Sequence, residues 1–213
     1  MGDSYIDVAI WPRRDAYQLF SRGYLPFFAL TTPLDVTELV RFTKREGLSF
    51  YRAMVYIVSR AMNELEPFRL RIRKDGIAVC ETVSPSYTTA GRDGSFGISD
   101  VEYLPGETMV DFCRRALEKE AGQREQMVVQ DDVRDDLIFI SSVPWFVTTS
   151  VLQEQPTNPD DSFPRVLWDR IHEEKGRQLV NFTAQLNHRL LDGSHVRDLL
   201  LRMEELMAPR HDL

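Results

Sequence analysis

The sequence predicts an α+β fold, in which a mixed β-sheet has helices packed on one face. Several short apolar runs with strand character are interspersed with a few amphipathic segments, which is the pattern of such a sheet. One of these segments, residues 50–65, has an apolar face broader than a surface helix needs. At 213 residues the chain can form one substantial core but is short for two ordinary domains. We therefore expect a single domain over residues 1–213.

Two consecutive helices are expected in the first quarter of the chain. An amphipathic helix begins at Asp35 and ends near Gly47. Ser49 can cap the helix that follows. The apolar face of this second helix comprises Met54, Val55, Ile57, Val58, Ala61, Met62 and Leu65. A face of this width indicates a helix that is buried on two sides.

A β-hairpin is expected next along the chain. Residues 68–72 alternate in polarity, Asp75-Gly76 is a favoured two-residue turn, and residues 77–82 form the returning strand. The elements that follow are strands over 86–89 and 95–99, around the turn Gly91-Arg92-Asp93-Gly94, and a helix over 108–121.

The second half of the chain is expected to supply the strands of the core sheet. These strands are 137–141, 145–151, 165–168 and 178–186. Residues 153–162 are rich in Pro, Asn and Asp, so they predict a surface loop. A final helix follows Asp192-Gly193, because Val196, Leu199, Leu200, Met203 and Leu206 recur at helical spacing.

A histidine at the junction of the last strand and the last helix is the strongest candidate for chemistry. His188 follows the strand-like run 179–186, and Asp192 stands four residues later in a turn. An imidazole whose backbone is fixed in this way can take a proton from a hydroxyl or thiol near neutral pH. The alternative is a histidine that only satisfies its own hydrogen bonds at a turn.

A metal site is a further alternative for the same residues. His188, Asp192 and His195 could converge as nitrogen and oxygen ligands. The Asp-Gly break disfavours one helical face that carries all three, and no cysteine lies nearby. We therefore expect no metal.

The composition excludes several classes of protein. A net charge of −7 argues against a nucleic-acid groove, which needs a basic stripe. Cys80 and Cys113 are too few for a disulfide framework, which indicates a reducing compartment. The N-terminus has no secretory signal, and the apolar runs fall far short of the ~20 residues of a membrane span. A cytoplasmic protein without membrane attachment is expected.

Four motifs, in this order along the chain, resemble those of the chloramphenicol acetyltransferases. They are Trp11-Pro12-Arg13, the segment 49–54, the segment Ser141-Ser142-Val143-Pro144-Trp145, and His188-x-x-x-Asp192-Gly193. The resemblance extends from about Ile6 to Leu206 and implies the two-layer sandwich of that family. The chain is also similar to the catalytic domain of dihydrolipoyl acyltransferases, which share the His-x-x-x-Asp-Gly signature. The length and the Trp-x-Arg start match the first family more closely, and no lipoyl-bearing region is present.

The resemblance implies an acetyl-CoA-dependent O-acetyltransferase, with chloramphenicol as the default acceptor and no tightly bound cofactor. His188 would be the general base that deprotonates the acceptor hydroxyl. Ser141 would donate a hydrogen bond to the tetrahedral oxyanion. Asp192 would be structural and paired with Arg13, as a buried carboxylate requires. The family is a homotrimer with its sites between subunits, so His188 and Ser141 would act across a subunit boundary.

The same resemblance assigns the remaining site residues. The acceptor-binding residues would be Phe20, Phe27, Thr88, Phe96 and Leu167, and the CoA-binding residues would be Trp145 and Arg170.

The sequence departs from the family pattern at several positions. Asn187 stands where the family has the first of two adjacent histidines, and Leu167 stands where it has a threonine that holds a water. The loop 26–29 is bulkier and one residue shorter. These changes leave two other functions open: a non-catalytic ligand-binding relative, and an acyltransferase for a different hydroxyl or thiol acceptor.

Overall fold

The computed structural model describes residues 3–90, 96–123, 134–154 and 156–208. The α-helices in these residues are α1 (Arg14–Phe20), α2 (Thr37–Glu46), α3 (Phe50–Glu64), α4 (Met109–Gln123) and α5 (Gly193–Met207). The strands are β1 (Ser4–Tyr5), β2 (Phe27–Asp35), β3 (Leu70–Arg73), β4 (Gly76–Val79), β5 (Ser84–Ala90), β6 (Phe96–Asp100), β7 (Leu137–Val143), β8 (Arg165–Asp169), β9 (His172–Glu174) and β10 (Arg177–Asn187).

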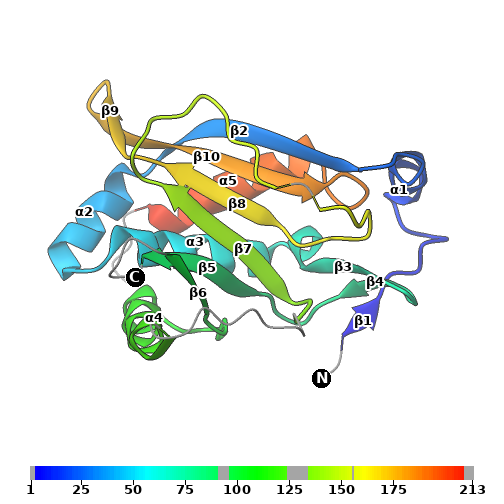
Figure 1. The fold of residues 1–213 in the computed structure, drawn as a ribbon, viewed down its shortest axis with the longest axis horizontal. Coiled ribbons are helices and arrows are strands. Elements are labelled where there is room, and N and C mark those ends of the chain that lie inside the picture. The colour runs from blue at the N-terminus through cyan, green and yellow to red at the C-terminus, as the bar shows by residue number, and fades with distance from the viewer. Residues whose placement is uncertain (1–2, 91–95, 124–133, 155, 209–213) are drawn as a thin grey trace.

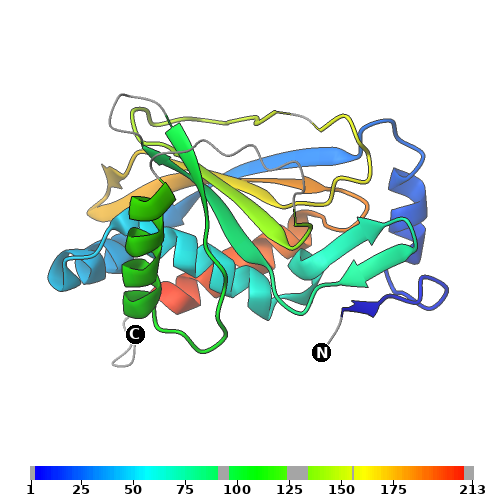
Figure 2. The ribbon, with the colours of Figure 1, turned by 60° about the horizontal axis from the view of Figure 1, so that its bottom comes forward.

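Seven strands form one mixed sheet in the order β2-β10-β8-β7-β5-β6, with β9 paired to β10 (Figure 1). The β5–β7 and β7–β8 pairs are parallel, and the others are antiparallel. A smaller sheet has the order β1-β4-β3. Figure 2 shows α3 and α5 together on one side of the large sheet, with the segment between β7 and β8 passing along the other side. The predicted α+β architecture, a mixed sheet with helices on one face, is confirmed.

The predicted central helix is α3, and it begins where its cap was expected. The Ser49 side chain accepts a hydrogen bond from the Arg52 N–H. Met54, Ile57 and Val58 have no exposed surface. Burying an aliphatic side chain of this size contributes about 1.5–3 kcal/mol, so α3 is the main anchor of the helical layer. The preceding helix, α2, ends at Gly47, whose φ of 65° is the left-handed conformation that glycine adopts without strain.

The strand β10 lies between β2 and β8 and leads directly to the candidate histidine. One face of β10 carries Val180, Phe182, Ala184 and Leu186 into the core, each at most 1% exposed. The opposite face carries Gln185, whose amide binds the backbone of the 144–164 segment, the chain between β7 and β8. The strand is therefore held from both sides, and its C-terminal end has a fixed position.

Residues 145–151 do not form the strand that was predicted from the sequence. Pro144 has no N–H for a ladder, and the chain turns where the Phe146 N–H binds the Val143 carbonyl oxygen at 3.5 Å. Trp145 and Phe146 are 70% and 61% exposed. Residues 145–151 therefore lie outside the sheet, although aromatic and β-branched residues are typical of strands.

Besides the short strands β1 and β9, two longer elements were absent from the sequence prediction. Arg14–Phe20 was assigned no helix or strand from the sequence but forms the helix α1. Residues 27–35 form β2, although Pro33 stands within it. Because β2 is an edge strand, the missing N–H of a proline can face away from the ladder, and the strand tolerates it.

The predicted hairpin is shifted at its start. Pro67 sits in a short 3₁₀ helix, Glu66–Arg69, so the first strand begins at Leu70 rather than at Phe68. The expected turn at residues 91–94 lies outside the described residues.

Candidate active site

His188 immediately follows β10, and its ring has a defined protonation pattern. The backbone N–H of His188 donates to the Pro26 carbonyl oxygen at 2.6 Å, one residue beyond the β2–β10 ladder. Ring atom Nδ1 lies 3.1 Å from the carbonyl oxygen of Leu191. Because a carbonyl oxygen can only accept, Nδ1 carries the hydrogen of a neutral ring. Nε2 is then the nitrogen that can accept a proton.

Two phenylalanines fix the plane of this ring. Phe20, the last residue of α1, stacks on His188 with centroids 3.8 Å apart and planes 14° apart. Phe28, in β2, lies at 4.5 Å in a tilted arrangement. Phe20, predicted as an acceptor contact, therefore contacts the candidate base directly. Phe27, predicted for the same role, is paired with Asn187 in the ladder.

Arg13 binds the turn that connects His188 to α5. Its Nη2 donates to the carbonyl oxygens of His188 and Leu191, both at 2.9 Å, and its Nε donates to that of Arg189 at 3.1 Å. Its Nη1 forms an ion pair with the Asp192 carboxylate. The predicted contact between Arg13 and Asp192 is confirmed. One guanidinium thus fixes most of the five-residue turn.

Asp192 is also the N-cap of α5. Its Oδ1 accepts from the backbone N–H of Ser194 at 2.9 Å and from the Ser194 hydroxyl at 2.6 Å. Partial burial acts to raise the pKa of the Asp192 carboxyl, but the hydrogen bonds from Ser194 and Arg13 outweigh it and hold the pKa well below its usual value. The carboxylate is therefore charged throughout the physiological range.

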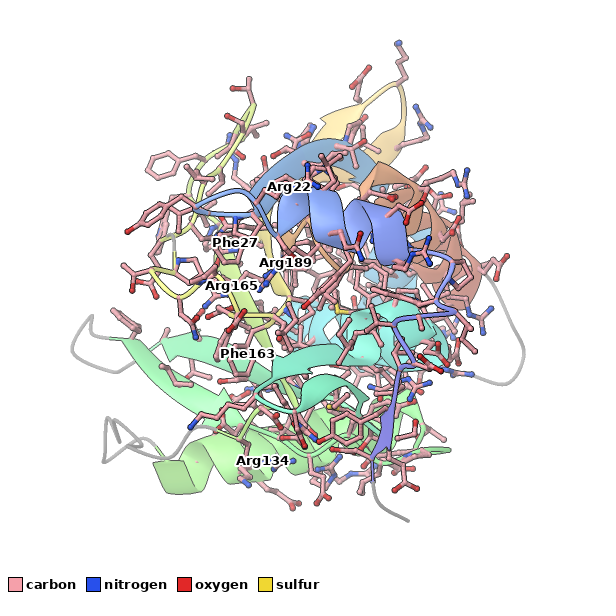
Figure 3. The ribbon with its side chains drawn as sticks, turned by 90° about the vertical axis from the view of Figure 1, so that its right-hand side faces the viewer. Arg22, Phe27, Arg134, Phe163, Arg165 and Arg189 are labelled. Atoms are coloured by element: carbon pink, nitrogen blue, oxygen red, sulfur yellow. The ribbon has the colours of Figure 1, made fainter. Side chains whose placement is uncertain are left out.

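Asn187, at the position of the missing histidine, holds the 144–164 segment. Its amide nitrogen donates to the carbonyl oxygens of Pro159 (2.9 Å) and Asp161 (2.8 Å). Arg189 binds the Asp160 carboxylate at 2.7 Å, and Arg165 binds that of Asp161 at 2.7 Å. Figure 3 looks onto this end of the molecule and shows Arg165 and Arg189 beneath Phe27. Asn187 is therefore a structural contact to this segment, which sequence reasoning missed.

Ser141 belongs to a second cluster, on β7. Its hydroxyl lies 3.2 Å from that of Thr88 on the neighbouring strand β5. The Thr88 hydroxyl also lies 3.4 Å from the Tyr51 hydroxyl, in the first turn of α3. Tyr51 and its contact with Thr88 were not assigned from the sequence.

A cavity of about 800 Å³ opens beside this second cluster. Its walls include four of the predicted contact residues, namely Thr88, Phe96, Trp145 and Arg170. Its other walls are Ser49, Phe50, Tyr51, Arg52, Thr89, Ala90, Glu120, Ser142, Pro144, Trp168, Asp169 and Ile171. Arg52 is paired with Glu120 in a bidentate contact at 2.9 and 2.6 Å. Among the described residues, Arg170 is a cation at this cavity that has no carboxylate within ion-pair distance.

The two clusters lie far apart within one chain. Ser141 on β7 pairs with Leu167 on β8, and Leu167 pairs with Thr183 on β10. His188 lies five residues beyond Thr183 along the direction of β10. With ~3.3 Å per residue and ~4.8 Å between strands, the Cα atoms of Ser141 and His188 are roughly 19 Å apart. Leu167, predicted to contact the acceptor, is 5% exposed and lies in the sheet between the two clusters.

In the part of the chain that the structure describes, no group of three or more His, Cys, Asp or Glu side chains has the arrangement of a metal site. No helix in the same residues has the length and apolar character to cross a membrane.

Comparisons with known proteins agree with this architecture. A model of the family described as chloramphenicol acetyltransferase matches residues 1–204. Chloramphenicol acetyltransferase 2 of Escherichia coli is 28% identical to this chain over 197 residues, which cover 92% of each protein. A solved structure of a chloramphenicol acetyltransferase has a TM-score of 0.84 at 20% identity, over 96% of this chain and 99% of that one. The cubic core of the pyruvate dehydrogenase multienzyme complex has a TM-score of 0.67 at 15% identity, over 91% and 88%.

The structural likenesses, at these identities, establish the fold. The family match covers nearly the whole sequence. The chain therefore belongs to the chloramphenicol acetyltransferase family, a family of acyltransferases.

Proposed function

We propose that this protein is an acetyl-CoA-dependent O-acetyltransferase and that chloramphenicol is its acceptor. The observation that carries the proposal is the ring of His188, whose Nδ1 is occupied by a carbonyl oxygen and whose Nε2 remains a base. The names of the relatives state both the acetyl group and chloramphenicol. The low sequence identity makes the acceptor the part of the proposal that most needs a test.

In the proposed reaction, Nε2 of His188 takes the proton of the acceptor hydroxyl. The acceptor oxygen attacks the thioester carbonyl carbon of acetyl-CoA, and the Ser141 hydroxyl donates to the oxyanion that forms. When the intermediate collapses, the C–S bond breaks and the proton on His188 passes to the CoA sulfur. The products are the O-acetyl ester and free CoA.

We propose that the two residues that act on one carbonyl come from different subunits. A base and an oxyanion donor that serve one carbonyl each lie about 3 Å from the reacting atoms. A Cα separation of roughly 19 Å within one chain is too large for a serine and a histidine to satisfy this condition. A homotrimer with a site at each interface, as the family resemblance implies, removes the conflict.

Acetyl-CoA is proposed to bind in the cavity beside Ser141. Trp145 offers an exposed indole for the pantetheine arm, and Arg170 offers a cation for a phosphate. Phe20 and Phe27 would contact the acceptor from the subunit that supplies His188. Phe96 and Leu167 would do so from the subunit that supplies Ser141.

A thiol-release assay tests the proposal. Free CoA is measured with acetyl-CoA and chloramphenicol, with a panel of other hydroxyl acceptors, and with dihydrolipoamide as a thiol acceptor. We expect release that depends on chloramphenicol. If CoA were released only with another acceptor, acyl transfer would still be supported and chloramphenicol would be rejected as the acceptor. Binding of chloramphenicol without release would identify a non-catalytic ligand-binding relative.

A further inference from the structure

The hydroxyl groups around Ser141 form a chain that ends at Tyr51, a partly buried tyrosine. Thr88 and Ser141 are neighbours because Tyr87 pairs with Ile140 in the parallel β5–β7 ladder, so the next residues lie side by side on one face. Their oxygens are 3.2 Å apart, and the Thr88 oxygen is 3.4 Å from that of Tyr51. No other side-chain hydrogen bond of Thr88, Ser141 or Tyr51 is found in the described residues.

The surroundings of Tyr51 determine the direction of these hydrogen bonds. Burial raises the pKa of Tyr51 to about 12, so the phenol keeps its proton. Its ring is fixed between Trp168 at 5.3 Å and Tyr87 at 5.9 Å. A phenol is a stronger acid than an aliphatic alcohol, so Tyr51 donates to Thr88. Thr88 then has its own hydrogen to give to its other partner, Ser141.

We propose that Thr88 and Tyr51 are positioning residues for Ser141, joined in a chain of donors from Tyr51 to Thr88 to Ser141. Because Ser141 accepts from Thr88, its own hydrogen is directed away from Thr88 and stays available for an oxyanion. Hydrogen bonds in such a chain polarise one another, which strengthens the last donor. Thr88 therefore acts through Ser141 rather than by touching the acceptor. This inference rests on the role proposed above for Ser141.

The test uses conservative substitutions, first in the natural protein and then in the Ser141→Ala protein. Thr88→Val removes the hydroxyl at nearly constant size, and Thr88→Ser keeps it. We expect Thr88→Val to lower kcat roughly three- to tenfold with unchanged KM values, the size of one net hydrogen bond. Thr88→Ser should recover most of the loss. Tyr51→Phe, one step further from the reacting atoms, should lower kcat by about twofold.

The decisive measurement places Thr88→Val in a Ser141→Ala protein. We expect Ser141→Ala alone to lower kcat by ~10²-fold, and Thr88→Val to add nothing to that loss. A matched control is Thr31→Val, which removes a similar cross-strand hydroxyl pair, between Thr31 and Thr183 at 2.8 Å, without touching Ser141. It should leave kcat unchanged. Thermal unfolding of each variant checks folding, and Thr88→Ala replaces Thr88→Val if the latter unfolds early.

Three results would overturn the inference in distinguishable ways. An equal loss from Thr88→Val with and without Ser141 would mean that Thr88 touches the acceptor, as the sequence suggested. If Thr88→Val kept a normal kcat while Ser141→Ala had a low one, the hydrogen-bond chain would be rejected and the proposed function would stand. A normal kcat for Ser141→Ala would instead reject both the chain and the oxyanion role.

Discussion

Three neighbours determine what His188 can do. The Leu191 carbonyl oxygen selects the tautomer, Phe20 stacks on the ring, and Phe28 packs against it in a tilted arrangement. An imidazole restrained in this way loses little entropy when an acceptor hydroxyl arrives at Nε2. The reactivity of the residue therefore depends on packing as well as on the residue type.

Replacing His188 by alanine should remove nearly all turnover because the acceptor proton then has no base. We expect a loss of ~10²–10⁴ in kcat, measured by thiol release with saturating acetyl-CoA. His172→Ala is the matched control, since that histidine lies on β9 and its ring binds, among the described residues, the Arg170 carbonyl oxygen alone. A His188→Ala protein that keeps more than about a tenth of its kcat would show that His188 is not the base.

Arg13 and Asp192 should behave as one unit in a double-mutant cycle. Breaking a fully buried ion pair costs ~3–5 kcal/mol, and the cost here should be smaller. The reason is that the Asp192 side chain is 33% exposed. Arg13→Ala and Asp192→Ala should each lower stability and activity, and the double variant should lose less than their sum. Urea unfolding and thiol release measure the two effects. Additive losses would mean that the contact contributes nothing.

The sequence was sufficient to predict part of the site at this scale. His188, Asp192, Arg13 and Ser141 stand in short motifs whose order along the chain carries the resemblance. The contact of Thr88 with Ser141 depends on the register of two strands that are far apart in sequence, and register leaves no local signal. The same reason hid the two bonds from Asn187 to the 144–164 segment.

At the scale of the elements, the N-terminal cap of α5 contains a group, His195, whose protonation depends on pH. Its capping box has the Asp192 N–H donating to Nδ1 of His195 at 3.0 Å, which requires an unprotonated Nδ1. Protonation of Nδ1 would replace this bond by one to the Asp192 Oδ1, which lies 3.1 Å away. Partial burial lowers the pKa of His195, although the Asp192 carboxylate acts in the opposite direction. The cap therefore favours neutral His195.

This cap should make stability depend on pH near the ordinary histidine value of about 6.5. Because the folded pKa lies below the unfolded one, the unfolded chain binds more protons between the two values, and stability rises with pH. His195→Gln keeps an acceptor for the cap but does not titrate. Urea unfolding should show that lowering the pH from 7.5 to 5.5 reduces the free energy of unfolding more in the natural chain than in His195→Gln. If both proteins lost the same free energy of unfolding, His195 would not be the cause of the pH dependence.

Elements with strong end signals were predicted well, and elements without them were not. Ser49, Gly47 and Asp192-Gly193 gave α2, α3 and α5 nearly correct ends. The strand β2 was missed because Pro33 is tolerated only at a sheet edge, and the sequence does not say which strand is at the edge. Residues 145–151 are rich in aromatic and β-branched residues, which are typical of a strand, but a strand also needs a neighbouring strand that the fold does not supply here.

For the whole molecule, the separation of the two clusters leads to a complementation prediction. A His188→Ala chain and a Ser141→Ala chain are each impaired, but an interface between them can join an intact His188 to an intact Ser141. If the proposed homotrimer assembles at random from equal amounts of the two chains, about a quarter of its sites are intact. We expect about that fraction of natural activity after co-expression, measured by thiol release.

A mixture of two separately folded and non-exchanging preparations is the control, and it should show no gain. If co-expression also gave no gain, the two residues would have to act within one chain. That outcome would require a large rearrangement of the sheet, because the ladder separates them by roughly 19 Å.

The pairing of β2 with β10 also has a consequence for how the protein is made. The ladder joins residues 27–35 to residues 179–187, and β2 has no other partner strand in the described part of the chain. A ribosome adds ~5–20 residues per second, so β2 waits on the order of 10 s for its partner to emerge. During that time Phe27 and Phe28 lack their final neighbours, and the ring of His188 cannot be packed. The site is thus assembled last, and a nascent chain that stalls before β10 presents an aromatic strand edge to chaperones.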